Sequence, residues 1–162
     1  MIHLHKFSHF VQAIYEARTS QSRTKTIVIV GLPGSGKTMK AKEIMKLNPG
    51  RSWKIYDDFE SEKALPKIGR ENQIISDGLL TLNPPEDGID EFREVADIMD
   101  SDFEVIYFEN DPESAKANIL RRWESGKGDR HQRPERLLAD LDYIAKRYQI
   151  PPGAKTIPVY KA

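Results

Sequence analysis

A glycine-rich segment that ends in lysine and threonine carries the clearest chemistry in this chain of 162 residues. The segment, GLPGSGKT at positions 31–38, fits the spacing G-x-x-x-x-G-K-[ST]. Glycines allow such a loop to curl until successive backbone N–H groups point at phosphate oxygens. The lysine would then reach the β- and γ-phosphates, and the threonine hydroxyl would ligate Mg²⁺. The sequence therefore predicts a nucleoside triphosphate site formed by Gly31, Pro33, Gly34, Ser35, Gly36, Lys37 and Thr38.

Three aspartates follow two short apolar segments and could supply the carboxylates that phosphoryl transfer needs. Asp57 and Asp58 follow residues 53–56, and Asp77 follows residues 73–76. An attacking hydroxyl must lose its proton, and either Asp57 or Asp58 is the candidate general base. Because neighbouring residues of an extended segment point to opposite sides, only one of this pair is expected to face the site. Asp77 is predicted to support the Mg²⁺ shell or to orient an arginine.

A basic, glycine-containing segment over residues 121–133 is predicted to form a lid over the phosphates. Arginine binds phosphate by forked hydrogen bonds, and glycines would let the loop close and exclude water. Arg122 and Arg130 are the candidates that would stabilise the transferring group. The alternative is an ordinary solvated loop between two helices.

Alternating strands and helices would position these residues. Apolar, β-branched patterns predict strands at 25–30, 53–56, 73–76, 103–108 and 157–160, the last interrupted by Pro158. Helices are expected at 37–47, 59–67, 84–99, 111–126 and 134–148. This alternation indicates an α/β fold, with a parallel sheet of about five strands and helices on both faces. Ligands of such sheets bind at the carboxyl ends of the strands, where the loop and the aspartates fall.

Composition limits the partners and the compartment expected for this protein. The 25 basic and 25 acidic residues cancel, which excludes a strong overall attraction to nucleic acid. The chain has no cysteine, and we find neither a signal peptide nor an apolar run that could cross a bilayer, so a cytoplasmic protein without a membrane partner is expected. Residues 1–24 are predicted as an extra N-terminal helix over 5–18 and a polar linker, ahead of one domain at 25–162. The oligomeric state is left open.

Several segments together resemble the polynucleotide kinase family of P-loop kinases in its phage form, over about residues 26–148. Besides the loop, they are Asn48-Pro49-Gly50, IYDDF at 55–59, IISD at 74–77, LNP at 82–84 and LRR at 120–122. The resemblance implies a kinase that uses ATP and Mg²⁺ and phosphorylates a hydroxyl of a nucleic acid. It implies Asp57 as the general base, Asp77 as a supporting aspartate and Arg122 as a lid arginine, with Lys127 or Arg130 in place of a second one.

One departure from the family bears on the acceptor. Glu60 stands where the family has an arginine that contacts the acceptor phosphate. Two acceptors therefore stay open, the 5′-hydroxyl of a polynucleotide and the hydroxymethyl group of 5-hydroxymethyluracil in phage DNA, with DNA favoured over RNA. If a phage encodes the protein, its compartment would be the host cytoplasm. The alternatives are a small-molecule nucleoside or nucleotide kinase, a toxin-type kinase acting on a sugar nucleotide, and a non-catalytic nucleotide-binding protein.

Overall fold

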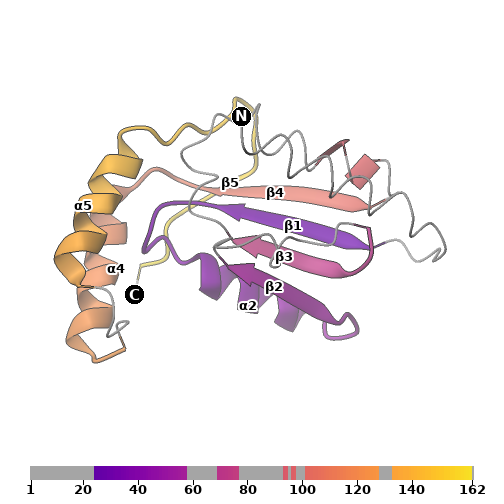
Figure 1. The fold of residues 1–162 in the computed structure, drawn as a ribbon, viewed down its shortest axis with the longest axis horizontal. Helices are drawn as coiled ribbons and strands as arrows, with labels where there is room; N and C mark the ends of the chain where they lie inside the picture. The colour runs from indigo at the N-terminus through magenta and orange to yellow at the C-terminus, as the bar shows by residue number, and fades with distance from the viewer. Residues whose placement is uncertain are drawn as a thin grey trace, which may run out of the picture.

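A parallel sheet forms the centre of the molecule (Figure 1). The computed structural model describes residues 24–57, 69–76, 93–94, 96–97, 101–127 and 133–161. Within these residues the sheet has five strands in the order β2-β3-β1-β4-β5, and every neighbouring pair is parallel. The predicted α/β architecture is confirmed. The strands are β1 (Lys25–Val30), β2 (Trp53–Asp57), β3 (Asn72–Ser76), β4 (Asp102–Phe108) and β5 (Thr156–Ile157).

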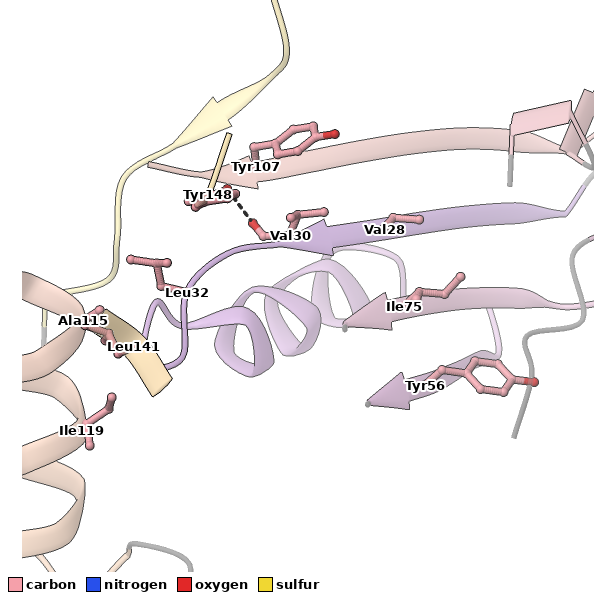
Figure 2. Close-up of a cluster of buried hydrophobic side chains, with 10 residues drawn as sticks. All are labelled: Val28, Val30, Leu32, Tyr56, Ile75, Tyr107, Ala115, Ile119, Leu141 and Tyr148. Carbon is pink, nitrogen blue, oxygen red and sulfur yellow. Dashed lines mark hydrogen bonds between the residues drawn. The ribbon is translucent and has the colours of Figure 1, made fainter. Parts of the chain in front are cut away.

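Helices pack on both faces of the sheet. On one face, α2 (Lys37–Leu47) buries Ala41 and Ile44 against alternate residues of the strands, including Ile27 and Ile29 of β1. On the other face, α4 (Pro112–Glu124) and α5 (Pro134–Ala145) share a cluster with Val28 and Val30 (Figure 2). Both faces of β1 are thus buried, which explains its unbroken apolar sequence.

Several predicted segments are tested only in part or not at all. Residues 93, 94, 96 and 97 are helical, within the helix predicted over 84–99. The predicted N-terminal helix and most of the linker after it, together with the predicted helix over 59–67, lie outside the described residues. No helix in the described part of the chain is long and apolar enough to span a membrane.

The helix predicted over 134–148 ends earlier, at Ala145. The side-chain amide of Asn110 donates to the carbonyl oxygen of Ala145 at 2.9 Å and so satisfies one of the last carbonyls of the helix. A turn follows, in which the backbone N–H of Tyr148 donates to the carbonyl oxygen of Ile144 at 2.8 Å. The buried side chain of Tyr148 donates its hydroxyl hydrogen to the carbonyl oxygen of Phe108 at 2.6 Å. This contact ties the end of α5 to the end of β4, beside the glycine-rich loop.

Replacing Tyr148 with phenylalanine is expected to lower the free energy of unfolding by about 1–3 kcal/mol, because a buried carbonyl loses its partner. Urea denaturation followed by circular dichroism measures this change. Tyr143, which is 52% exposed, provides the matched control, since Tyr143→Phe should change stability by less than about 0.5 kcal/mol. Equal stability of Tyr148→Phe and the wild type would show that the hydroxyl does not stabilise this junction.

The strand predicted over 157–160 is shorter than expected. Strand β5 covers only Thr156 and Ile157, and Pro158 follows directly. Proline has no N–H to donate to a neighbouring strand, so pairing stops there. Beyond Pro158 the backbone N–H of Tyr160 donates to the carbonyl oxygen of Ser35 in the glycine-rich loop, at 3.1 Å. The C-terminal segment therefore leaves the sheet for the loop.

Candidate functional site

The glycine-rich loop connects the carboxyl end of β1 to the start of α2, as predicted (Figure 1). Leu32 anchors it in the core cluster with Ala115 and Leu141 of the other helices (Figure 2). Thr38 lies in the first turn of α2 and is exposed. The first N–H groups of a helix have no intrahelical acceptor and carry the positive end of its dipole, so this position suits an anion.

The carbonyl groups of the loop are held by donors on the protein. The ammonium group of Lys37 donates to the carbonyl oxygens of Gly31 at 2.9 Å and Leu32 at 3.1 Å. The carbonyl oxygen of Gly34 accepts from the side-chain amide of Asn118 at 3.0 Å. The next two carbonyls, of Ser35 and Gly36, accept from the backbone N–H groups of Tyr160 and Lys40. A loop whose carbonyls are engaged in this way can turn its N–H groups toward a phosphate.

Two loop glycines are required by their backbone angles and by close neighbours. Gly34 has φ +81°, and a Cβ atom there would lie 2.5 Å from the carbonyl oxygen of Ala115. Gly36 has φ +105°, and a Cβ atom there would lie 2.4 Å from Cδ2 of Tyr160. The loop is therefore a cradle with no room for side chains on the sides where α4 and the C-terminal segment pack.

Replacing Gly36 with alanine is expected to lower stability by about 1–3 kcal/mol and to weaken ATP binding, because the positive φ and the contact with Tyr160 both oppose a side chain. Gly50→Ala is the control, since a Cβ atom at Gly50 has no neighbour within 4 Å. Thermal unfolding and a nucleotide titration of both variants test this. Normal ATP affinity of Gly36→Ala would contradict the required loop conformation.

A buried hydroxyl inside the loop fits an anion site. Ser35 is fully buried, and its Oγ atom has no hydrogen-bond partner among the described residues. Buried polar atoms without a partner are uncommon and often mark a place for water or a ligand. The O–H group and the crowded glycines are both features that fit a site for phosphate groups.

The predicted base lies at the same edge of the sheet as the loop. Asp57 is the last residue of β2, is exposed, and pairs in register with Ser76 of β3. Ser76 pairs in turn with Ile29 of β1, two residues before the loop. With strands about 4.8 Å apart, the backbone of Asp57 is roughly 10 Å from β1, close enough for an acceptor to fit between. Asp58 and Asp77 lie outside the described residues.

Arg122 lies on the helix face that contacts the loop. A Cβ atom at Gly34 would lie 2.8 Å from Cγ1 of Ile119, and Arg122 follows Ile119 by three positions along α4. Residues three positions apart share one face of a helix. Arg122 is exposed, so its guanidinium can extend toward the edge where the loop lies. Arg130 and the central part of the predicted lid lie outside the described residues.

The sequence did not indicate a role for Ser76, beside Asp57 in the sheet, or for Asn118 and Tyr160, which contact the loop. Ser76 has a buried hydroxyl without a partner among the described residues, next to Asp57 in the sheet. Asn118 and Tyr160 contact the loop from far along the chain. Desolvation and the hydrogen bond to Glu43 raise the pKa of the Tyr160 hydroxyl to about 12. The same hydrogen bond lowers the pKa of Glu43. No local sequence pattern signals these contacts.

The comparisons with known proteins bear on the fold and on the family of this chain. No family model matches the sequence. Among solved structures, the chain is similar to one of the PezAT chromosomal toxin–antitoxin system of Streptococcus pneumoniae, with TM-score 0.51, 16% identity, and coverage of 84% of this chain and 70% of that one. A fungal RNA kinase gives TM-score 0.50 and 15% identity over 87% of this chain and 77% of its own. The candidate fructose transport system kinase of Silicibacter sp. TM1040 gives TM-score 0.50 and 14% identity over 94% and 98%.

These structural similarities identify the fold as that of the α/β P-loop kinases. Among curated proteins, the uncharacterized protein R277 of Acanthamoeba polyphaga mimivirus is 33% identical over 130 residues, which cover 76% of this chain and 86% of R277. On this identity and coverage, the chain belongs to the family of mimivirus protein R277.

Proposed function

We propose that this protein is an ATP-dependent kinase of the polynucleotide kinase type, which transfers the γ-phosphoryl group to a hydroxyl of a nucleic acid. One arrangement carries the proposal, a phosphate cradle between β1 and α2 with the carboxylate of Asp57 at the same edge of the sheet. A cradle alone would bind a nucleotide, whereas a carboxylate about two strands away supplies the base that transfer to a hydroxyl requires.

In the proposed reaction, Asp57 accepts the proton of the acceptor hydroxyl, and the hydroxyl oxygen forms a bond to the γ-phosphorus. The bond from the γ-phosphorus to the bridging oxygen breaks, and ADP leaves. Lys37 and the loop N–H groups stabilise charge on the phosphates, and Arg122 stabilises the transferring group. Thr38 and Asp77 would hold Mg²⁺, which when bound would supply positive charge that offsets the charge of the phosphates.

A nucleic acid acceptor, with DNA favoured over RNA, is supported by the sequence segments at 74–77 and 82–84 that resemble polynucleotide kinases. The fold shared with a fungal RNA kinase is compatible with it. Glu60 disfavours the usual phosphate contact beside a 5′-hydroxyl, so the hydroxymethyl group of 5-hydroxymethyluracil in DNA is the second acceptor we propose.

An acceptor panel with γ-labelled ATP and Mg²⁺ tests the proposal. It contains 5′-hydroxyl DNA, 5′-hydroxyl RNA, DNA with 5-hydroxymethyluracil and blocked 5′ ends, free nucleosides and nucleoside monophosphates. We expect label in at least one polynucleotide and none in the free nucleosides. Label confined to nucleosides or monophosphates would replace the proposal with a small-molecule kinase, and label in no acceptor would reject it.

A further inference from the structure

Two residues far apart in the sequence hold the outer side of the phosphate loop. The side-chain NH₂ group of Asn118, on α4, donates to the carbonyl oxygens of Gly34 and Tyr160. Both partners are carbonyl oxygens, which only accept, so the NH₂ end of the amide must face them. Asn118 lies 84 positions from Gly34 and 42 from Tyr160, and it is only 9% exposed. One buried amide thus joins α4, the loop and the C-terminal segment.

Tyr160, in the C-terminal segment, also contacts the loop directly. Its backbone N–H donates to the carbonyl oxygen of Ser35 at 3.1 Å, and its ring lies against Gly36. Its hydroxyl donates to Glu43 on α2, the helix that the loop begins. The ring of Phe108 is 6.1 Å away and tilted by 50°, so Tyr160 is held between the loop and the end of β4.

These hydrogen bonds fix the direction of loop N–H groups. In a planar trans peptide the C=O of one residue and the N–H of the next point in opposite directions. Tyr160 holds the Ser35 carbonyl toward the C-terminal segment, which turns the N–H of Gly36 to the opposite side. The Asn118 amide binds the carbonyl of Gly34, in the preceding peptide of the loop. It also binds the carbonyl of Tyr160, the residue whose N–H holds Ser35. Loss of the amide would remove the Asn118 donor from two partly buried carbonyls and free the loop to rotate its peptides.

We infer that Asn118 and Tyr160 are positioning residues for nucleotide binding. The side-chain amide of Asn118 and the backbone N–H of Tyr160 keep the loop in its anion-binding conformation. The inference rests on the nucleotide-binding part of the proposed function and is independent of the acceptor. It predicts that the affinity for phosphate groups depends on a side chain of α4 and on the C-terminal segment.

Equilibrium titration with ADP and, separately, with tripolyphosphate tests the inference. Asn118→Leu removes the donor at similar volume, and Asn118→Asp replaces it with a carboxylate facing two carbonyls. Because two partly buried carbonyls lose the Asn118 donor and the loop can then rotate its peptides, we expect both affinities to fall roughly 5- to 100-fold, and by similar factors for the two ligands. An effect on a base-binding contact would weaken ADP and spare tripolyphosphate.

Gln73→Met is the matched control. The buried amide of Gln73 donates to the hydroxyl of Thr26 at 3.1 Å, at the start of β1 and β3 and so at the end of the sheet away from the loop. It should lower the unfolding midpoint as the Asn118 variants do but leave both affinities unchanged. Unchanged affinities in both Asn118 variants, or an equal loss in Gln73→Met, would overturn the inference.

A second pair of variants covers the case in which the Asn118 variants do not fold. Tyr160→Ala removes the ring but keeps the backbone N–H, whereas Tyr160→Pro removes that N–H as well. We expect the proline variant to bind tripolyphosphate at least about fivefold more weakly than the alanine variant, and equal affinities would reject the role of this N–H. If the wild-type protein binds ADP but phosphorylates no acceptor, the kinase proposal is wrong and the positioning role of Asn118 and Tyr160 stands. If it binds neither ADP nor tripolyphosphate, both proposals are wrong.

Discussion

Replacing Lys37 with alanine is expected to lower phosphoryl transfer about 10²- to 10³-fold, the usual loss when one preorganised group that stabilises developing charge is removed. ATP affinity should fall as well, because the ammonium group has two roles. It carries the positive charge proposed to bind the β- and γ-phosphates, and it donates to the carbonyl oxygens of Gly31 and Leu32. Steady-state kinetics with labelled ATP and a nucleotide titration measure the two effects separately.

The control for Lys37→Ala is Lys42→Ala. Lys42 is an exposed lysine on the same helix, so its removal changes the net charge equally without touching the loop. Its variant should keep wild-type transfer and affinity. Full activity in Lys37→Ala would contradict the whole account, since Lys37 is the one lysine of the glycine-rich loop at 31–38.

Replacing Asp57 with asparagine is expected to lower transfer about 10²- to 10⁴-fold while ATP affinity stays close to that of the wild type, because a general base acts on the acceptor and not on the donor. The amide has nearly the same shape as the carboxylate but cannot accept the proton. Single-turnover transfer from prebound ATP is the appropriate measurement, since it separates the chemical step from binding and product release.

Two further variants serve as a control for Asp57→Asn and as a test of the neighbouring carboxylate. Asp102→Asn, at the first residue of β4 and thus at the opposite end of the sheet, should transfer normally. Asp58→Asn tests the neighbouring carboxylate. If Asp58→Asn abolishes transfer and Asp57→Asn does not, the base is Asp58, and the assignment made from the end of β2 is wrong.

Local patterns predicted the elements that carry the loop. The strand at 25–30 and the helix at 37–47 are found at the predicted residues, because burial on both faces of β1 requires an apolar run and the loop fixes where α2 begins. Helix α4 begins at Pro112, within one residue of the predicted start, because the side chain of Asp111 caps it by accepting from the backbone N–H of Ser114 at 3.0 Å.

The remaining features depend on contacts between distant residues. Strand β5 ends at Ile157 because Pro158, already visible in the sequence, removes a donor. Helix α5 ends at Ala145, whose carbonyl oxygen accepts from the distant Asn110. The contacts of Asn118 and Tyr160 with the loop join segments that are far apart in the sequence. An asparagine within a helix and a tyrosine near the C-terminus have no distinctive spacing, so no sequence period could have indicated them.

The proposed activity of this chain is transfer of the terminal phosphoryl group of ATP to a nucleic acid. The most direct test incubates the wild-type protein with a polynucleotide acceptor and Mg²⁺, using ATP labelled at either the γ- or the α-phosphorus. Transfer of the γ-phosphoryl group predicts label in the acceptor from γ-labelled ATP only, with ADP formed in equal amount. Label from α-labelled ATP, or ADP formed without label in any acceptor, would contradict the claim.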